Sequence, residues 1–319
     1  MTIACVFPGQ GSQSVGMMAA YGDAAAIRDT FAEASDALAI DLTGMIAEGP
    51  AEALNQTVNT QPAMLAAGVA VYRLWLTLGG AQPALMAGHS LGEYTALTCA
   101  GALNFADALR LVRLRAEAMQ SAVPDGVGTM AAILGLDDDA IRAVCAEAAQ
   151  GEVLAAVNFS SPGQVVIAGH KTAVDRGCAL AKQRGAKRAL PLPVSVPSHC
   201  DLMRPAAEKL LVAMNAIEIK TPVIPVIHNA DVAAHNDPAA IRDALARQLY
   251  SPVRWVETMQ AFAAQGVTRI AECGPGKVLT GLNKRILADV PTLALADAAA
   301  LVELRDINTS RLKGETDGS

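Results

Sequence analysis

The chain has 319 residues, of which 52% are hydrophobic and 18% charged, so it can bury a sizeable core in one large domain or two ordinary ones. Its net charge of −6 excludes the basic surface that nucleic-acid binding requires, so no nucleic-acid partner is expected. There is no run of about 18 apolar residues and no basic leader, which predicts neither a membrane span nor a signal peptide. The six scattered cysteines form no CxxC pair, which indicates reduced thiols in a cytoplasmic protein without a metal site.

Short apolar runs alternate with amphipathic segments over the first part of the chain. Strands are predicted at 3–7 and 84–88, because these runs are short, apolar and followed by glycine-containing turns. Helical spacing is present in four segments, at 23–38, 62–78, 91–100 and 107–120. Strands that alternate with helices predict an α/β fold with a parallel sheet.

A different order of elements begins near Pro124. The predicted elements are a strand, a helix, two strands joined by the turn SSPG, a helix and a strand, at 128–136, 137–150, 153–159, 164–170, 172–185 and 187–194. The order βαββαβ is the ferredoxin-like pattern. We therefore expect a small domain at 124–196, inserted into a large discontinuous domain of residues 1–123 and 197–305.

The alternation then resumes towards the C-terminus. A strand is predicted at 222–230, helices at 238–250 and 253–265, and a further strand at 268–274. The last residues, 306–319, are polar and are expected to be a disordered tail.

Residues 88–92 read GHSLG and match the pattern G-x-S-x-G. In this pattern the serine stands on a sharp turn between a strand and a helix, and the flanking glycines leave room for the turn. The apolar run before Ser90 and the helix after it provide that context. Ser90 is therefore the candidate nucleophile, and the N–H of Leu91 is a candidate oxyanion donor. The alternative is a surface turn with a helix-capping serine.

The loop PGQGSQ at 8–13 follows the first strand. It is not a dinucleotide-binding fingerprint, because Ser14 stands where the third glycine is required, and no Gly-Lys-Ser/Thr follows for a P-loop. Gln10 could supply a second oxyanion N–H, or the loop could be a plain strand-to-helix turn. The residues alone leave both possibilities open.

A nucleophilic serine needs a base, and five histidines are available: 89, 170, 199, 228 and 235. His199 is the best candidate, because it lies on a proline-marked loop where the small domain rejoins the large one. No acid that would orient it is evident, since Asp201 is too close in sequence. A backbone carbonyl can hold the imidazole instead.

Arg115 lies on the apolar face of the predicted helix at 107–120. A buried guanidinium is costly unless it is paired with an anion. The residues allow a structural ion pair with a buried acid, which is the more common case, or a substrate carboxylate bound by two hydrogen bonds.

Several motifs occur together along the chain. They are FPGQGSQ (7–13), TQPAML (60–65), GHSLGEY (88–94), the helix with Arg115, NFSSPGQVVIAG (158–169), PVSVPSHCDLM (193–203), RQLYSPVRW (247–255) and GPGKVLTGL (274–282). In combination they resemble the malonyl-CoA:acyl-carrier-protein transacylases of bacterial type II fatty-acid synthesis. The resemblance covers residues 3 to 290 without a departure at the catalytic positions. It implies an α/β-hydrolase-like core with a parallel sheet and an inserted ferredoxin-like small domain.

The resemblance also implies the chemistry. Ser90 would be the nucleophile and His199 its base, and the N–H groups of Gln10 and Leu91 would form the oxyanion hole. A malonyl-serine intermediate would pass its acyl group from malonyl-CoA to the phosphopantetheine thiol of acyl carrier protein, with ping-pong kinetics. No cofactor and no metal would be needed.

Four further residues receive roles from the resemblance. Arg115 would bind the malonyl carboxylate, and Gln248 would orient the histidine through its backbone carbonyl. His89 and Gln61 would line the site in supporting roles.

The partners follow from the same resemblance. The acidic acyl carrier protein would dock transiently at the cleft between the domains, on a chain expected to be a monomer. Basic residues of the small domain are candidates for that contact, with ordinary solvated charge as the alternative: Lys171, Arg176, Lys182, Arg184, Lys187 and Arg188.

Two rival functions use the same residues differently. A serine thioesterase or esterase would pass the acyl group from Ser90 to water, but has no use for a buried cation such as Arg115. A non-catalytic protein that binds acyl-CoA or acyl carrier protein would gain nothing from a Ser90–His199 pair.

Overall fold

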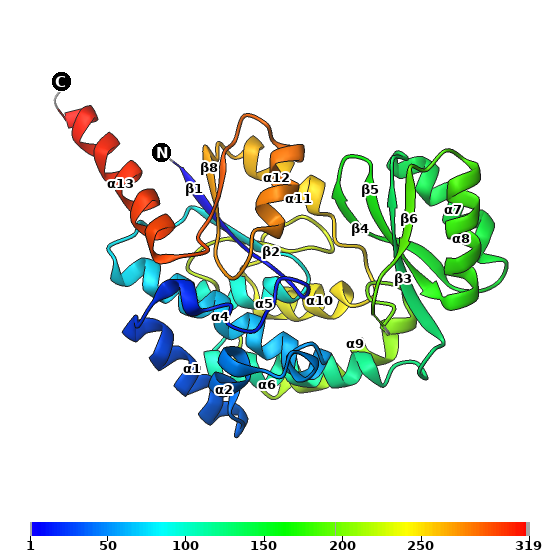
Figure 1. The fold of residues 1–319 in the computed structure, drawn as a ribbon, viewed down its shortest axis with the longest axis horizontal. Helices are drawn as coiled ribbons and strands as arrows, with labels where there is room; N and C mark the ends of the chain where they lie inside the picture. Colours follow the sequence, from blue (N-terminus) through cyan, green and yellow to red (C-terminus); the bar gives the residue numbers. More distant parts are fainter. Residues whose placement is uncertain (1, 195, 317–319) are drawn as a thin grey trace.

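The computed structural model describes residues 2–194 and 196–316. Its larger sheet has five strands in the order β7-β2-β1-β8-β9, and all pairs are parallel. The strands are β1 (Ile3–Phe7), β2 (Leu85–Gly88), β7 (Val226–Ile227), β8 (Arg269–Glu272) and β9 (Thr292–Ala294). This sheet is the predicted α/β core (Figure 1).

Helices cover both faces of the parallel sheet (Figure 1). Successive side chains of β1 point to opposite faces of the sheet. Ile3, Cys5 and Phe7 pack in the core on one face, and Ala4 and Val6 pack in the core on the other. A strand buried on both faces reads as a continuous apolar run, which is why IACVF predicts it.

The helices of this larger part are α1 (Ala25–Leu38), α2 (Leu42–Glu48), α3 (Ala51–Leu54), α4 (Thr57–Thr77), α5 (Leu91–Cys99), α6 (Phe105–Gln120), α9 (Arg204–Asn215), α10 (Pro238–Gln248), α11 (Trp255–Ala264), α12 (Val278–Ile286) and α13 (Ala298–Thr316). Single turns of 3₁₀ helix lie at Ala19–Tyr21 and Asp201–Met203. Among the described residues, no helix is apolar over a length that would span a bilayer.

The second sheet is antiparallel and has its own hydrophobic core. Its strands are β3 (Gly128–Leu134), β4 (Leu154–Ser161), β5 (Gln164–His170) and β6 (Arg188–Pro191), and its helices are α7 (Asp138–Ala149) and α8 (Lys171–Gln183). The order β4-β5-β3-β6 with helices between the strands is the ferredoxin-like arrangement, as predicted. Both helices lie on the side away from the parallel sheet (Figure 1). Domain boundaries at 124 and 196 stay a prediction.

Two features differ from the sequence prediction. The strand expected at 222–230 is only Val226–Ile227, because Pro222 and Pro225 have no N–H to donate to a ladder. The tail expected to be disordered from Asp306 continues helix α13 as far as Thr316, and 317–319 lie outside the described residues. Asp297 caps this helix, and the Leu, Glu and Arg residues of α13 are all good helix formers.

Candidate active site

Ser90 stands between strand β2 and helix α5, at the N-cap of the helix. Its backbone has φ +52° and ψ −107°, a conformation that non-glycine residues seldom adopt. A Cβ at Gly88 would lie 1.8 Å from the carbonyl carbon of Gly92, and one at Gly92 would lie 2.1 Å from the oxygen of Phe7. Only glycine fits at either position, so the turn has the tight geometry that the pattern predicts.

His199 lies against the serine. Its Nε2 is 2.8 Å from Ser90 Oγ, and its Nδ1 is 2.8 Å from the backbone oxygen of Gln248. A carbonyl oxygen can only accept, so Nδ1 carries the ring proton and Nε2 is left to accept from the serine hydroxyl. Asp201 is paired with Arg204 on the surface instead.

The surroundings of His199 keep its ring neutral. Burial lowers its pKa to about 3, and the positive charge of Arg115 acts in the same direction. The ring is therefore in the form that can accept a proton at neutral pH.

Arg115 is 1% exposed, as its place on the apolar face of α6 predicts. Its Nη2 donates to Ser90 Oγ at 3.1 Å and to the Gln248 side-chain oxygen at 3.0 Å, and its Nη1 donates to Gln61 Oε1 at 2.9 Å. Its guanidinium lies 5.3 Å from the centre of the Tyr94 ring. Within the described residues it forms no ion pair and its Nε has no partner, which disfavours the structural ion pair.

The two candidate oxyanion donors lie beside the serine. Gln10 and Leu91 both line the pocket that holds Ser90. Within residues 2–194 and 196–316, neither of their backbone N–H groups donates a hydrogen bond. The loop that carries Gln10 packs tightly on the elbow, since a Cβ at Gly9 would lie 2.5 Å from the oxygen of His89.

His89 lines the same pocket but belongs to a different contact. Its ring lies 5.6 Å from that of Trp255, at a tilt of 57°. Burial lowers its pKa to about 4, so this ring is neutral as well. The other histidines have contacts of their own: His170 with the N–H of Val153, His228 with Glu93 and His235 with Asp231.

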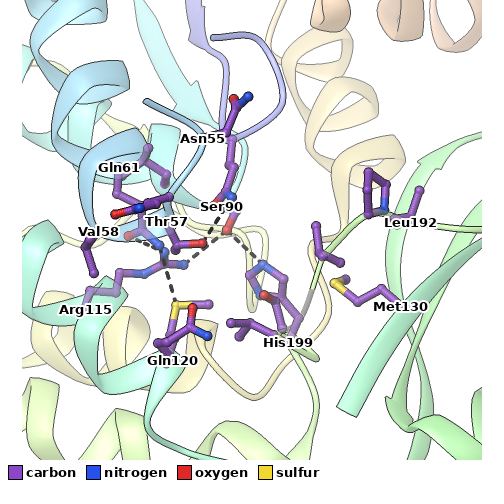
Figure 2. A pocket seen from close by; sticks show the side chains of 18 of the residues that line it. Asn55, Thr57, Val58, Gln61, Ser90, Arg115, Gln120, Met130, Leu192 and His199 are labelled. Carbon is purple, nitrogen blue, oxygen red and sulfur yellow. Dashed lines mark hydrogen bonds between the residues drawn. The ribbon is translucent and has the colours of Figure 1, made fainter. Parts of the chain in front are cut away.

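The pocket has a volume of about 540 Å³ and lies between the two sheets. Ser90, Leu91, Gln61 and Arg115 come from the larger part. The small sheet and the segment after it contribute Met130, Asn158, Leu192, Pro193 and Val194. Figure 2 shows Ser90 between His199 and Arg115, with Met130 and Leu192 across the opening.

Two buried residues that the sequence did not identify hold the site together. Glu93 accepts hydrogen bonds from the Gln248 side chain and the N–H of Asn229, whose own side chain binds the N–H of Ser90. Glu93 is a lone charge in the otherwise apolar segment LGEYTAL, so it carries the same signal as Arg115, a charged residue among apolar neighbours. Asn229 gives no such signal.

Among the residues that the structure describes, no group of three or more His, Cys, Asp or Glu side chains is arranged to hold a metal ion. All six cysteines are free.

The chain is similar to known acyl transferases over nearly its whole length. The family model "Acyl transferase domain" matches residues 4–304. The malonyl CoA-acyl carrier protein transacylase of Salmonella typhimurium is 59% identical over 299 residues, which cover 93% of this chain and 97% of that protein.

Solved structures give the same result. An acyl carrier protein S-malonyltransferase from Vibrio cholerae has a TM-score of 0.94 at 57% identity, with 95% of this chain and 100% of that one covered. A malonyl-transacylase in complex with its type II PKS acyl-carrier protein has a TM-score of 0.95 at 53% identity, with 96% and 99% covered.

Proposed function

The chain belongs to the acyl transferase family, and on that premise we propose that it moves a malonyl group from malonyl-CoA to the phosphopantetheine thiol of an acyl carrier protein. One observation carries the proposal. Ser90 Oγ lies within hydrogen-bond distance of both His199 Nε2 and Arg115 Nη2, so a base and a cation meet at one hydroxyl.

The first half-reaction acylates Ser90. Its Oγ attacks the thioester carbonyl of malonyl-CoA while His199 Nε2 takes the hydroxyl proton. The oxyanion is held by the N–H groups of Gln10 and Leu91. The carbon–sulfur bond then breaks, and CoA leaves as a thiol with the proton from His199.

The second half-reaction reverses these steps with a new thiol. The phosphopantetheine thiol gives its proton to His199, and its sulfur attacks the carbonyl of the malonyl-serine. The bond between the acyl carbon and Ser90 Oγ breaks, and the oxygen takes the proton back from His199. The covalent intermediate predicts ping-pong kinetics.

Arg115 supplies the preference for malonyl groups. Its partners Gln61, Gln248 and Ser90 are neutral, so the guanidinium keeps its charge for a substrate carboxylate. An esterase acting on simple acyl groups has no need of this buried cation.

The partner and the setting belong to the same proposal. A similar malonyl-transacylase is known in complex with an acyl-carrier protein, which supports a carrier protein as acceptor here. Independence from cofactors, a monomeric state and a cytoplasmic location stay predictions.

The deciding experiment is the intact mass of the protein after mixing with malonyl-CoA, beside the variant Ser90→Ala. We expect a gain of one malonyl group that is absent in the variant and is discharged by carrier protein bearing a free phosphopantetheine thiol. Release of free malonate and CoA without transfer would instead establish a hydrolase. The absence of both an adduct and turnover would indicate a binding protein.

A further inference from the structure

Glu93 is a fully buried carboxylate in the first turn of α5, three residues after Ser90. Its Oε1 accepts from His228 Nδ1 at 2.7 Å. Its Oε2 accepts from the N–H of Asn229 and from Gln248 Nε2, both at 2.9 Å. Burial of a carboxylate is costly unless hydrogen bonds compensate it, and here three donors do so.

The carboxylate determines which way the Gln248 amide points. An ionised carboxylate only accepts, so the group that faces Glu93 must be the NH₂ end of the amide. The same nitrogen donates to the backbone oxygen of Ser90 at 2.9 Å. The amide oxygen is thereby left facing Arg115 Nη2, which donates to it at 3.0 Å.

The same carboxylate also supports the elbow. Asn229 donates its N–H to Glu93, accepts from the N–H of Ser90 at 2.8 Å and donates to the oxygen of Gly88 at 2.7 Å. Glu93 thus reaches the nucleophile through Asn229 and the guanidinium through Gln248.

This arrangement answers a problem raised by Arg115. A direct ion pair would balance its charge but would occupy the N–H groups that a substrate carboxylate needs. Glu93 instead lies one amide away from the guanidinium, across Gln248. The anion is close enough to favour the charged form of Arg115, yet it does not compete for its donors.

We propose that Glu93 is a positioning residue for malonyl transfer, which fixes the amide of Gln248 and so aims the guanidinium of Arg115 at the acyl group on Ser90. This inference rests on the proposed function. Glu93 acts through Gln248 and touches neither substrate nor reacting atoms.

The test compares the rates at which malonyl-CoA and acetyl-CoA acylate Ser90, measured by quenched-flow intact mass on the full chain. In Glu93→Gln an amide faces Gln248, so the Gln248 amide can reverse and present its NH₂ to Arg115. We expect malonylation to slow by about 10- to 100-fold, because a misplaced group costs that much. Acetylation does not use the guanidinium, so the malonyl-to-acetyl ratio should fall about tenfold or more.

The matched control is Glu272→Gln. Glu272 is also fully buried and accepts hydrogen bonds from Leu279 and Thr280 at the start of α12, outside the site. Its loss should lower the melting temperature and leave the malonyl-to-acetyl ratio unchanged. An unchanged ratio in Glu93→Gln, even with both rates reduced, would make Glu93 merely structural and overturn the proposal.

A second variant keeps the test decisive if Glu93→Gln does not fold. Gln248→Met removes the side-chain amide and keeps the backbone oxygen that orients His199. It should lower the ratio by a similar factor, and the double variant should lose no more than Gln248→Met alone. Additive losses, or a wild-type ratio in Gln248→Met, would contradict the proposal. If the wild type itself is not malonylated, the proposed function fails instead.

Discussion

His199 is held neutral by its surroundings, and this has a consequence for catalysis. The ring must be unprotonated at Nε2 to accept the hydroxyl proton of Ser90. Its pKa of about 3, against an ordinary value of 6.5, keeps the ring neutral even in mildly acidic solution. Burial lowers this pKa most, the nearby charge of Arg115 comes next, and His89 makes a smaller contribution in the same direction. A change at Arg115 should therefore alter the pH dependence of acylation.

We predict that acylation at low malonyl-CoA concentration is insensitive to pH around 6.5 and falls only in more acidic solution. A depressed pKa means that the active, neutral ring persists as the pH falls, until the pH approaches that pKa. In Arg115→Met one cause is removed, so the acid limb should move upward towards 6.5. The measurement is the initial rate of malonyl-serine formation against pH. A limb near 6.5 in the wild type would contradict the assignment.

Arg115 should also decide which acyl group is taken. In Arg115→Met the side chain keeps its length and loses its charge, so a malonyl carboxylate loses its partner. We predict that kcat/KM for malonyl-CoA falls by a factor worth about 2–5 kcal/mol relative to that for acetyl-CoA. The two substrates are assayed side by side on the same preparation. Equal losses for both would show that Arg115 has a structural role alone.

At the scale of elements, the strand-turn-helix unit of β2 and α5 depends on close backbone contacts. Gly92 lies on the first turn of α5, directly against the oxygen of Phe7 at the end of β1. The elbow, the first strand and the loop with Gln10 therefore form one packed unit. A side chain inserted here has to push helix α5 away from the end of strand β1.

We predict that Gly92→Ala lowers the free energy of unfolding by about 1–3 kcal/mol and also impairs acylation. The control is Gly281→Ala in helix α12, where an added Cβ has nothing within 4 Å. Alanine is the better helix former, so this variant should gain about 0.5–1 kcal/mol and keep its activity. Both are measured by denaturant titration. A destabilised Gly281→Ala would show that the contact argument fails.

At the scale of the whole molecule, the pocket joins two separately packed parts. Strand β6 begins with Arg188 and leads to Leu192, Pro193 and Val194 on the pocket wall. Three basic residues in helix α8 and at its end are already in ion pairs: Lys171 with Asp175, Arg176 with Glu152, and Arg184 with Glu147. Among the described residues, three of the basic candidates are exposed and form no ion pair: Lys182, Lys187 and Arg188. Lys187 and Arg188 lie directly before the segment that reaches the pocket wall, so they are the better candidates for carrier contact.

We predict that charge reversal at Lys187 and Arg188 together raises the KM for carrier protein roughly fivefold, since exposed ion pairs are worth up to about 1 kcal/mol each. Malonylation of Ser90 should be unaffected, because CoA loading does not involve the carrier. Lys171→Glu serves as the control, as its charge is already balanced by Asp175. An unchanged carrier KM in the double reversal would remove this surface from the docking proposal.

The sequence predicted the fold well where one physical pattern dominates. Buried parallel strands such as 3–7 are continuous apolar runs, and the inserted βαββαβ order is regular. Two signals in the sequence identified the site. Glycines flank Ser90 between a strand and a helix, and the charged Arg115 lies on the apolar face of a helix. The apolar run at 222–230 predicts too long a strand β7, because prolines interrupt it, and polarity alone predicts disorder in a tail that is helical as far as Thr316. Glu93 and Asn229 depend on contacts across more than 130 residues, which spacing cannot reveal.

The positive φ of Ser90 lowers the stability of the fold at the residue whose hydroxyl is needed for activity. A serine at φ +52° costs on the order of 1–3 kcal/mol, which the surrounding contacts must offset. Glycine would adopt the same conformation without that penalty, but it has no hydroxyl to acylate. Selection for stability alone would therefore remove the nucleophile. A serine at this position is therefore retained for its hydroxyl and not for folding, so the residue records a trade-off between stability and function.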